Sequence, residues 1–250
     1  DVGPDITTDG LPGARAQWPD ETRAREMQGF CETLQAYSAA CEQVALRVLQ
    51  AISANLGMPA QYLDGCFDAT HTSFLRLNHY PACANPAPAD TPGIPASGHL
   101  GIHHHTDSGA LTVLLQDGQA GLQVLHGEHW RLVQPRENAL LVNIGDIVQV
   151  WSNDRYRAPL HRVLANATAA RYSAPYFYNP SYTTVYAPLP GACDVANPAR
   201  YRPIHWGEFR AARAAGDYAD YGEEVQISRY RVEGASGTAP LVDMGCTLGK

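Results

Sequence analysis

A histidine and an aspartate separated by one residue are the feature that most constrains this chain. The segment His103–Asp117 reads HHHTDSGALTVLLQD and is typical of a β-strand, so His105 and Asp107 are predicted to share one strand face. Their Cα atoms would then lie about 6 to 7 Å apart, which allows both side chains to bind one metal ion. The fold must therefore bring a further ligand to this face.

His161, in the run APLHRVLAN, is the best candidate for the third ligand. Two histidines and one carboxylate on a rigid sheet form the facial ligand set of non-haem Fe(II) sites, which leaves positions open for substrate and oxygen. The sequence therefore predicts an iron site made of His105, Asp107 and His161.

A second polar pair follows ten residues after His161. Arg171 and Ser173 are two residues apart and would face the same side of a strand. Arginine binds a carboxylate through two parallel hydrogen bonds, and a neighbouring hydroxyl can add a third. This pair is a candidate clamp for a carboxylate.

Short apolar runs separated by Gly, Asn and Asp turns dominate the middle of the chain and predict a β-sandwich or barrel. A double-sheet jelly roll suits a central metal, because inward-facing residues of several strands converge there. The predicted strands lie within residues 72–80, 100–106, 110–116, 122–126, 130–134, 139–144, 147–151, 160–165 and 172–178.

Helices are predicted on both sides of this β-rich region. An apolar stripe from Glu21 to Leu56 indicates an amphipathic helix that packs on a sheet. Asp20 is its expected N-cap, Gly29 a point where it would break and Gly57 its C-terminal stop. A second helix is predicted over residues 206–215, ended by Gly216, and an extended segment over 223–232.

Composition excludes several classes of partner. The 250 residues carry a formal charge of −7, which argues against nucleic acid or an anionic membrane as the main partner. No apolar run approaches the roughly 18 residues of a membrane span. The six cysteines form no CxxC pair and are expected to be reduced thiols in cytoplasm. A small molecule is the expected partner, and the oligomeric state stays open.

The order and spacing of several motifs carry a family resemblance. From about Phe74 to about Tyr230 the chain resembles the 2-oxoglutarate/Fe(II)-dependent oxygenases of the isopenicillin N synthase-like family. The motifs that carry it are HTD, LHRV, RYS, LRLNHYPAC, NIGDIVQVWSN and NPARYRPIHWGEF.

The resemblance implies a mainly β protein with flanking helices, folded as a double-stranded β-helix of the jelly-roll, cupin-like type. It implies Fe(II), 2-oxoglutarate and O2 as cofactor and co-substrates, with Arg171, Ser173, Tyr80 and Asn78 holding 2-oxoglutarate. The expected activity is hydroxylation, desaturation or cyclisation of a small molecule of specialised metabolism. Pro159, two residues before His161, and a shortened N-terminal region depart from the family pattern.

Three further residues are candidates for substrate contact. His103 shares the predicted strand face of His105, and its alternative is a supporting or packing role. Phe177 shares the face of Arg171 and Ser173, and would form either an apolar wall of the site or part of the core. Arg76 would meet either a substrate carboxylate or an acidic neighbour.

Residues 1–250 are expected to form a single oxygenase domain. Its mainly helical N-terminal part, 1–70, is expected to be truncated, and its jelly-roll catalytic core spans 71–232. Three rival functions stay open: a 2-oxoglutarate-independent Fe(II) oxidase of the isopenicillin N synthase type, a non-catalytic cupin-like metal-binding protein and a zinc hydrolase. The hydrolase is disfavoured because no general base accompanies the triad.

Overall fold

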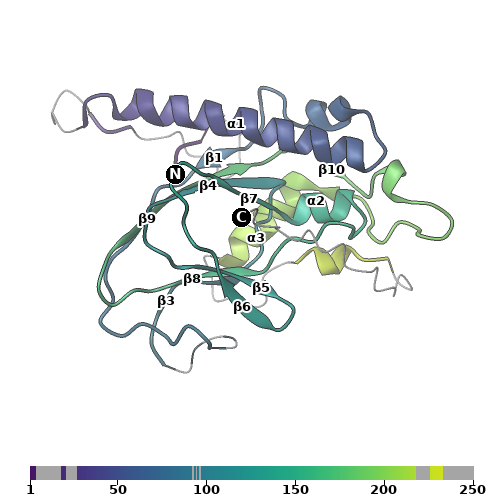
Figure 1. Cartoon of the computed structure of the whole chain (residues 1–250). Helices are drawn as coiled ribbons and strands as arrows, with labels where there is room; N and C mark the ends of the chain where they lie inside the picture. Colours follow the sequence, from purple (N-terminus) through teal and green to yellow (C-terminus); the bar gives the residue numbers. More distant parts are fainter. Residues whose placement is uncertain are drawn as a thin grey trace.

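Two antiparallel β-sheets face each other across the middle of the molecule (Figure 1). The structure is a computed structural model and describes residues 1–3, 18–20, 27–91, 93, 95, 97–217 and 226–232. Within these residues the larger sheet has the order β1-β9-β4-β7, with β2 also paired to β9, and the smaller sheet the order β3-β8-β5-β6.

The larger sheet contains β1 (Phe74–Leu75), β2 (Asn78–Tyr80), β4 (Leu111–Gln116), β7 (Leu141–Ile144) and β9 (Arg171–Tyr178). The smaller sheet contains β3 (Leu100–His105), β5 (Leu122–His126), β6 (His129–Leu132) and β8 (His161–Leu164). These strands lie where the sequence predicted them, except that the run 72–80 is divided between β1 and β2. The arrangement fits the predicted jelly roll.

Alternation along β4 separates the core from the space between the sheets. Leu111 and Val113 are buried in the main hydrophobic core, whereas Thr112 and Leu114 line a cavity on the opposite face. The core fills the region between the larger sheet and the helices, and burying each such aliphatic side chain contributes about 1.5 to 3 kcal/mol. The helices thus stabilise the outer face of the larger sheet and leave its inner face free to build a site.

Helix α1 (Phe30–Asn55) lies along the larger sheet (Figure 1) and packs on β4 and β9. Its buried stripe consists of Cys41, Ala45, Leu49, Ile52 and Ser53. The helix starts at Phe30 because Gly29 adopts a left-handed conformation, with φ of 80°. Gly29 thus breaks the predicted helix Glu21–Leu56, as expected, and Gly29 instead of Asp20 is the N-cap of α1. Residues 21–26 lie outside the described residues. Gly57, with φ of 79°, stops the helix as predicted.

The segment 147–151, predicted as a strand, is instead part of helix α2 (Asp146–Trp151). Ile147, Val148, Val150 and Trp151 are all buried, so the run shows no periodicity that separates a strand from a helix. The first turn of α2 is fixed to the chain after β3, because the Asp146 amide donates to the carbonyl of Asp107 at 2.8 Å.

The C-terminal part also differs from expectation. Helix α3 (Trp206–Asp217) continues through Gly216 instead of ending there. The predicted extended segment 223–232 contains a short 3-10 helix, η4 (Ile227–Tyr230), and residues 223–225 lie outside the described residues. Four short elements were not predicted: η2 (Ala60–Cys66), β10 (Val185–Tyr186), η3 (Pro190–Ala192) and β11 (Ile204–His205).

No helix in the described ranges is long and apolar enough to cross a membrane. The five cysteines that the structure describes are free thiols: Cys31, Cys41, Cys66, Cys83 and Cys193. Cys246 lies outside the described residues.

A buried carboxylate ties the end of α2 to the chain before and after α3. Asp154 accepts hydrogen bonds from Tyr201 (2.5 Å), Gln149 (3.0 Å) and Arg231 (2.9 Å), and lies 3.5 Å from Arg200. Burial acts to raise the pKa of Asp154, but these hydrogen bonds and the charge of Arg231 outweigh it and lower that pKa. The folded chain therefore favours the ionised carboxylate.

Replacing Asp154 with Asn is expected to reduce the free energy of unfolding at pH 7 by about 1 to 3 kcal/mol, since the donors lose a charged acceptor. The folded pKa of Asp154 lies below its unfolded value of about 3.9, so its contribution is present above that pH and is lost as the pH falls. Urea unfolding at pH 7 and pH 3 should show the difference between wild type and Asp154→Asn shrinking at pH 3. Asp90→Asn, at an exposed position, is the control, and an equal effect of both substitutions would contradict the assignment.

Candidate functional site

A cavity of about 1230 Å³ lies between the two sheets. Its lining includes the side of the smaller sheet that carries the predicted metal ligands and the side of the larger sheet that carries the predicted carboxylate clamp. The structure thus brings both predicted groups into one space.

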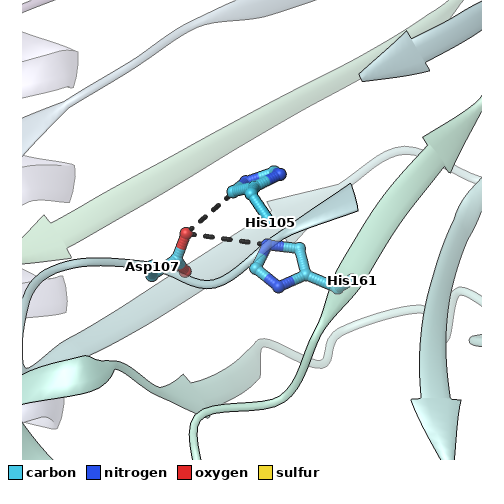
Figure 2. A group of neighbouring side chains, drawn as sticks. All are labelled: His105, Asp107 and His161. Atoms are coloured by element: carbon cyan, nitrogen blue, oxygen red, sulfur yellow. Dashed lines mark ion pairs between the residues drawn. The ribbon is translucent and has the colours of Figure 1, made fainter. Parts of the chain in front are cut away.

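His105, Asp107 and His161 converge as predicted (Figure 2). The Nε2 atoms of His105 and His161 lie 3.7 and 3.6 Å from Oδ1 of Asp107, and the three potential ligand atoms lie within 4.8 Å of one another. His105 ends β3 and His161 begins β8, where the two residues are register partners. Asp107 lies beyond the end of β3, so the prediction that it belongs to a strand was wrong. Register shifts interrupt β3 before His105, and Asp107 lies in the irregular segment that follows the strand.

Backbone carbonyls fix the orientation of the two histidine rings and the nitrogen of each that carries the proton. Nδ1 of His105 lies 2.8 Å from the carbonyl oxygen of His103, and Nδ1 of His161 lies 3.0 Å from that of Pro159. A carbonyl only accepts, so each Nδ1 carries the proton and each Nε2 offers its lone pair to the centre of the triad. Pro159, which departs from the family pattern, therefore orients His161 through its backbone carbonyl. Any residue at this position would supply the same carbonyl.

The Asp107 carboxylate is held by two residues that the sequence did not single out. Its Oδ2 accepts hydrogen bonds from Thr112 (2.5 Å) and Asn143 (2.8 Å), which leaves Oδ1 facing the histidines. Thr112 and Asn143 are register partners on β4 and β7, so the larger sheet positions a ligand of the smaller sheet's site. Asn143 belongs to the NIGD motif, which was the available signal for it. Nothing in the sequence marked Thr112.

Burial, and then the neighbouring His161, lower the pKa of His105. A neutral imidazole is the form that binds a metal. The donor set of two imidazoles and one carboxylate, which line the cavity, fits a divalent iron ion.

Helix α3 also contacts the segment that carries Asp107. Arg213 donates to the carboxylate of Asp146 at 2.8 Å and to the carbonyl of Thr106 at 3.1 Å. Thr106 lies between two of the metal-site residues, so this arginine links α2, α3 and the turn that presents Asp107. The sequence did not indicate this role.

Arg171 is buried on β9, with 2% of its surface exposed. Its Nη2 donates to Gln116 at 3.0 Å, and its Nη1 lies 3.5 Å from the Ser173 hydroxyl. Its Nε has no hydrogen-bond partner among the described residues, where the guanidinium also has no ion pair. Burying a guanidinium without a paired anion costs folding free energy, and an anion bound beside it would reduce this cost. The surroundings of Arg171 therefore suit the carboxylate of a ligand.

Strand β2 places Tyr80 and Asn78 beside this arginine. Tyr80 is the register partner of Arg171, and the guanidinium carbon lies 5.2 Å from its ring centre. Asn78 is the partner of Ser173 and donates to its hydroxyl at 3.3 Å. The four residues predicted to bind one carboxylate therefore form one cluster.

The three candidates for substrate contact all line the cavity. Phe177 stacks on Phe74 with ring centres 4.8 Å apart, which makes an apolar wall. The Arg76 guanidinium forms two hydrogen bonds of 2.7 and 2.8 Å with Asp1, so it does meet an acidic neighbour. His103 is exposed, and its carbonyl orients His105.

Residues 71–180 match the 2OG-Fe(II) oxygenase superfamily. Gibberellin 2-beta-dioxygenase 6 of Oryza sativa subsp. japonica is 39% identical over 224 residues, covering 88% of this chain and 57% of its own length. Jasmonate-induced oxygenase 1 of Arabidopsis thaliana is 36% identical over 166 residues, covering 66% and 39%. The chain spans about half the length of the curated relatives it matches.

Solved structures share the fold. Full-length Neurospora crassa T7H in complex with alpha-KG and 5-formyluracil has a TM-score of 0.71 and 30% identity, covering 86% of this chain and 67% of its own. JOX2 in complex with 2OG, Fe and JA has a TM-score of 0.64 and 31% identity, covering 78% and 53%. These similarities confirm the predicted double-stranded β-helix fold. Together with the triad, they place the chain among jelly-roll proteins with a metal site. The chain belongs to the 2OG-Fe(II) oxygenase superfamily.

Replacing Thr112 with Val should weaken metal binding about 10- to 100-fold, because one hydrogen bond that orients Asp107 is lost while the shape is kept. Fe(II) titration under argon measures the dissociation constant. Thr184→Val, which removes a hydroxyl bonded only to the carbonyl of Cys66, should leave the constant unchanged. Unaltered Fe(II) affinity in Thr112→Val would show that Asp107 does not depend on this contact.

Proposed function

We propose that this protein is a 2-oxoglutarate-dependent Fe(II) dioxygenase that oxidises a small organic molecule. One observation carries the proposal: a two-histidine, one-carboxylate cluster and a buried arginine without an anionic partner, among the described residues, line the same cavity. The first group suits iron and the second suits a ligand carboxylate. One relative is named as a gibberellin 2-beta-dioxygenase, and the similar JOX2 structure is a complex with 2OG, Fe and JA, which supports a small-molecule substrate.

In this proposal His105, Asp107 and His161 hold Fe(II). Bound iron and 2-oxoglutarate supply the oxidising chemistry, in which decarboxylation of 2-oxoglutarate and use of O2 are coupled to hydroxylation, desaturation or ring closure of the substrate. The chain supplies geometry: the carbonyls of His103 and Pro159 orient the imidazoles, and the larger sheet orients the carboxylate.

The far carboxylate of 2-oxoglutarate is assigned to Arg171 and Ser173. The unpartnered Nε of Arg171 supplies one donor, and the Ser173 hydroxyl lies beside the guanidinium. Tyr80 packs against the guanidinium and Asn78 holds the serine hydroxyl, so both restrict the clamp. Because the clamp is buried, a ligand that fills it excludes water from the charge pair, which strengthens the attraction.

The remaining roles concern the substrate and the extent of the domain. Phe177 is assigned to an apolar wall for the substrate and His103 to the exposed part of the cavity, while Arg76 supports the wall through its contacts with Phe74 and Phe177. The catalytic unit is assigned to residues 71–232. A cytoplasmic location and a role in specialised metabolism stay predictions.

The buried clamp gives a direct test of 2-oxoglutarate dependence. Charge-assisted hydrogen bonds contribute about 1.5 to 3 kcal/mol each, so Arg171→Leu should raise the dissociation constant of 2-oxoglutarate by about two orders of magnitude, at about 1.4 kcal/mol per tenfold. Ser173→Ala removes a neutral donor and should do less. Calorimetric titration of the Fe(II) protein under argon measures both, and Fe(II) binding itself should not change.

Two outcomes would contradict the proposal. If Arg171→Leu binds 2-oxoglutarate as tightly as wild type, the clamp lies elsewhere. If wild type consumes O2 with a substrate at full rate when 2-oxoglutarate is omitted, the protein is an oxidase of the isopenicillin N synthase type. Metal binding without O2 consumption under either condition would indicate a non-catalytic metal-binding protein.

A further inference from the structure

Arg210, on α3, is a second cation of the cavity and has no counter-charge in the described structure. Its guanidinium carbon lies 5.2 Å from the ring centre of Phe74 and 5.8 Å from that of Trp206. The side chain is partly buried and lines the cavity. Among the described residues no carboxylate pairs with it, so two aromatic faces hold a guanidinium whose donors are available to a ligand.

The other arginines of the cavity differ in this respect. Arg76 is paired with Asp1 at 2.7 Å, and Arg213 is paired with Asp146 at 2.8 Å. Arg171 has no carboxylate partner in the described part of the chain, but the clamp assigned above uses it. Among the described residues that line the cavity, Arg210 is therefore the arginine whose charge is balanced neither by a carboxylate nor by the proposed co-substrate.

Register along the larger sheet separates Arg210 from the clamp. Arg210 contacts Phe74, which is the partner of Phe177 near one end of β9, whereas Arg171 begins β9. Six residues of strand span about 20 Å. The aromatic pair that Arg210 contacts therefore lies at the opposite end of β9 from the clamp.

The same register places Arg210 near the metal site. Phe177 is the partner of Thr112, whose hydroxyl holds Asp107. On α3, Arg210 is one helical turn before Arg213, which bonds the carbonyl of Thr106. The cation and its aromatic wall thus lie beside the triad, at the end of β9 away from the clamp.

We infer that Arg210, Phe74 and Phe177 form the subsite for the prime substrate, and that the substrate is an organic monocarboxylate with an apolar or ring-containing body. The guanidinium binds the carboxylate, and the stacked Phe74 and Phe177 rings contact the body. One uncompensated cation matches one negative charge, whereas a phosphate dianion would leave a charge unpaired in a partly buried site. This inference rests on the proposed function, because it concerns the substrate of the same cavity.

The test compares acids with their neutral amides on the full chain loaded with Zn(II) and saturated with 2-oxoglutarate, so that no turnover occurs and the clamp is occupied. The probes are 3-phenylpropionate, 2-naphthoate and cyclohexylacetate, each beside its primary amide, with phenyl phosphate as a dianion. Ligand-observed NMR gives the dissociation constants. Wild type should bind at least one acid at least tenfold more tightly than its amide, which is about 1.4 kcal/mol, and more tightly than phenyl phosphate.

Variants connect the preference to Arg210. Arg210→Gln should remove the preference for the acid, and Arg210→Lys should keep part of it. Arg202→Gln is the matched control, because Arg202 also lies over an aromatic ring, that of Tyr230 at 5.1 Å, but outside the cavity lining. It should bind the acids as wild type does.

The inference is overturned if no acid binds, if the amides bind as well as the acids, if phenyl phosphate binds more tightly, or if Arg210→Gln keeps the preference. Binding of 2-oxoglutarate is measured separately in each variant and should not change in Arg210→Gln. A protein that prefers acids through Arg210 but does not bind 2-oxoglutarate would refute the proposed function and leave the anion subsite standing, so the two failures are distinguishable.

Discussion

The hydrogen bonds to Asp107 are the constraint on which the site depends. The smaller sheet supplies both histidines, but the carboxylate between them is held by Thr112 and Asn143 of the larger sheet. The backbone of Asp107 is fixed in turn by the first turn of α2. Both sheets and α2 therefore contribute to the geometry of the triad. The hydrophobic core that holds these elements together supports the metal site indirectly.

Strand β9 sets the spacing of the cavity. Its inward face carries Arg171 and Ser173 near one end and Phe177 near the other, with β2 and β1 pairing beside them. A polar cluster suited to a carboxylate and an aromatic wall suited to a substrate are thus separated by one strand's length. The position of Arg210 at the aromatic end adds a second charge. In the proposals made for this cavity, the ends of one regular strand therefore define a co-substrate region and a substrate region, with the metal site beside them.

Local patterns in the sequence predicted the parts of the fold that depend on local chemistry. Alternation and turn residues marked the strands, and the spacing of His105, Asp107 and His161 marked the triad. The segment 147–151 was misassigned because four of its five residues are apolar and buried, so a short helix there has the same pattern as a buried strand. Contacts between distant strands, such as the bond from Thr112, leave no periodic signal, so they required the structure.

Anaerobic titration of the wild-type protein with Fe(II) and 2-oxoglutarate tests the central claim most directly. The account predicts a visible charge-transfer band that requires both components, with one Fe(II) bound per chain. His161→Ala should lose the iron and the band while remaining folded, whereas His104→Ala, whose ring lies toward Trp130, should keep both. Equal iron stoichiometry in wild type and His161→Ala, or no band in wild type at saturating Fe(II) and 2-oxoglutarate, would contradict it.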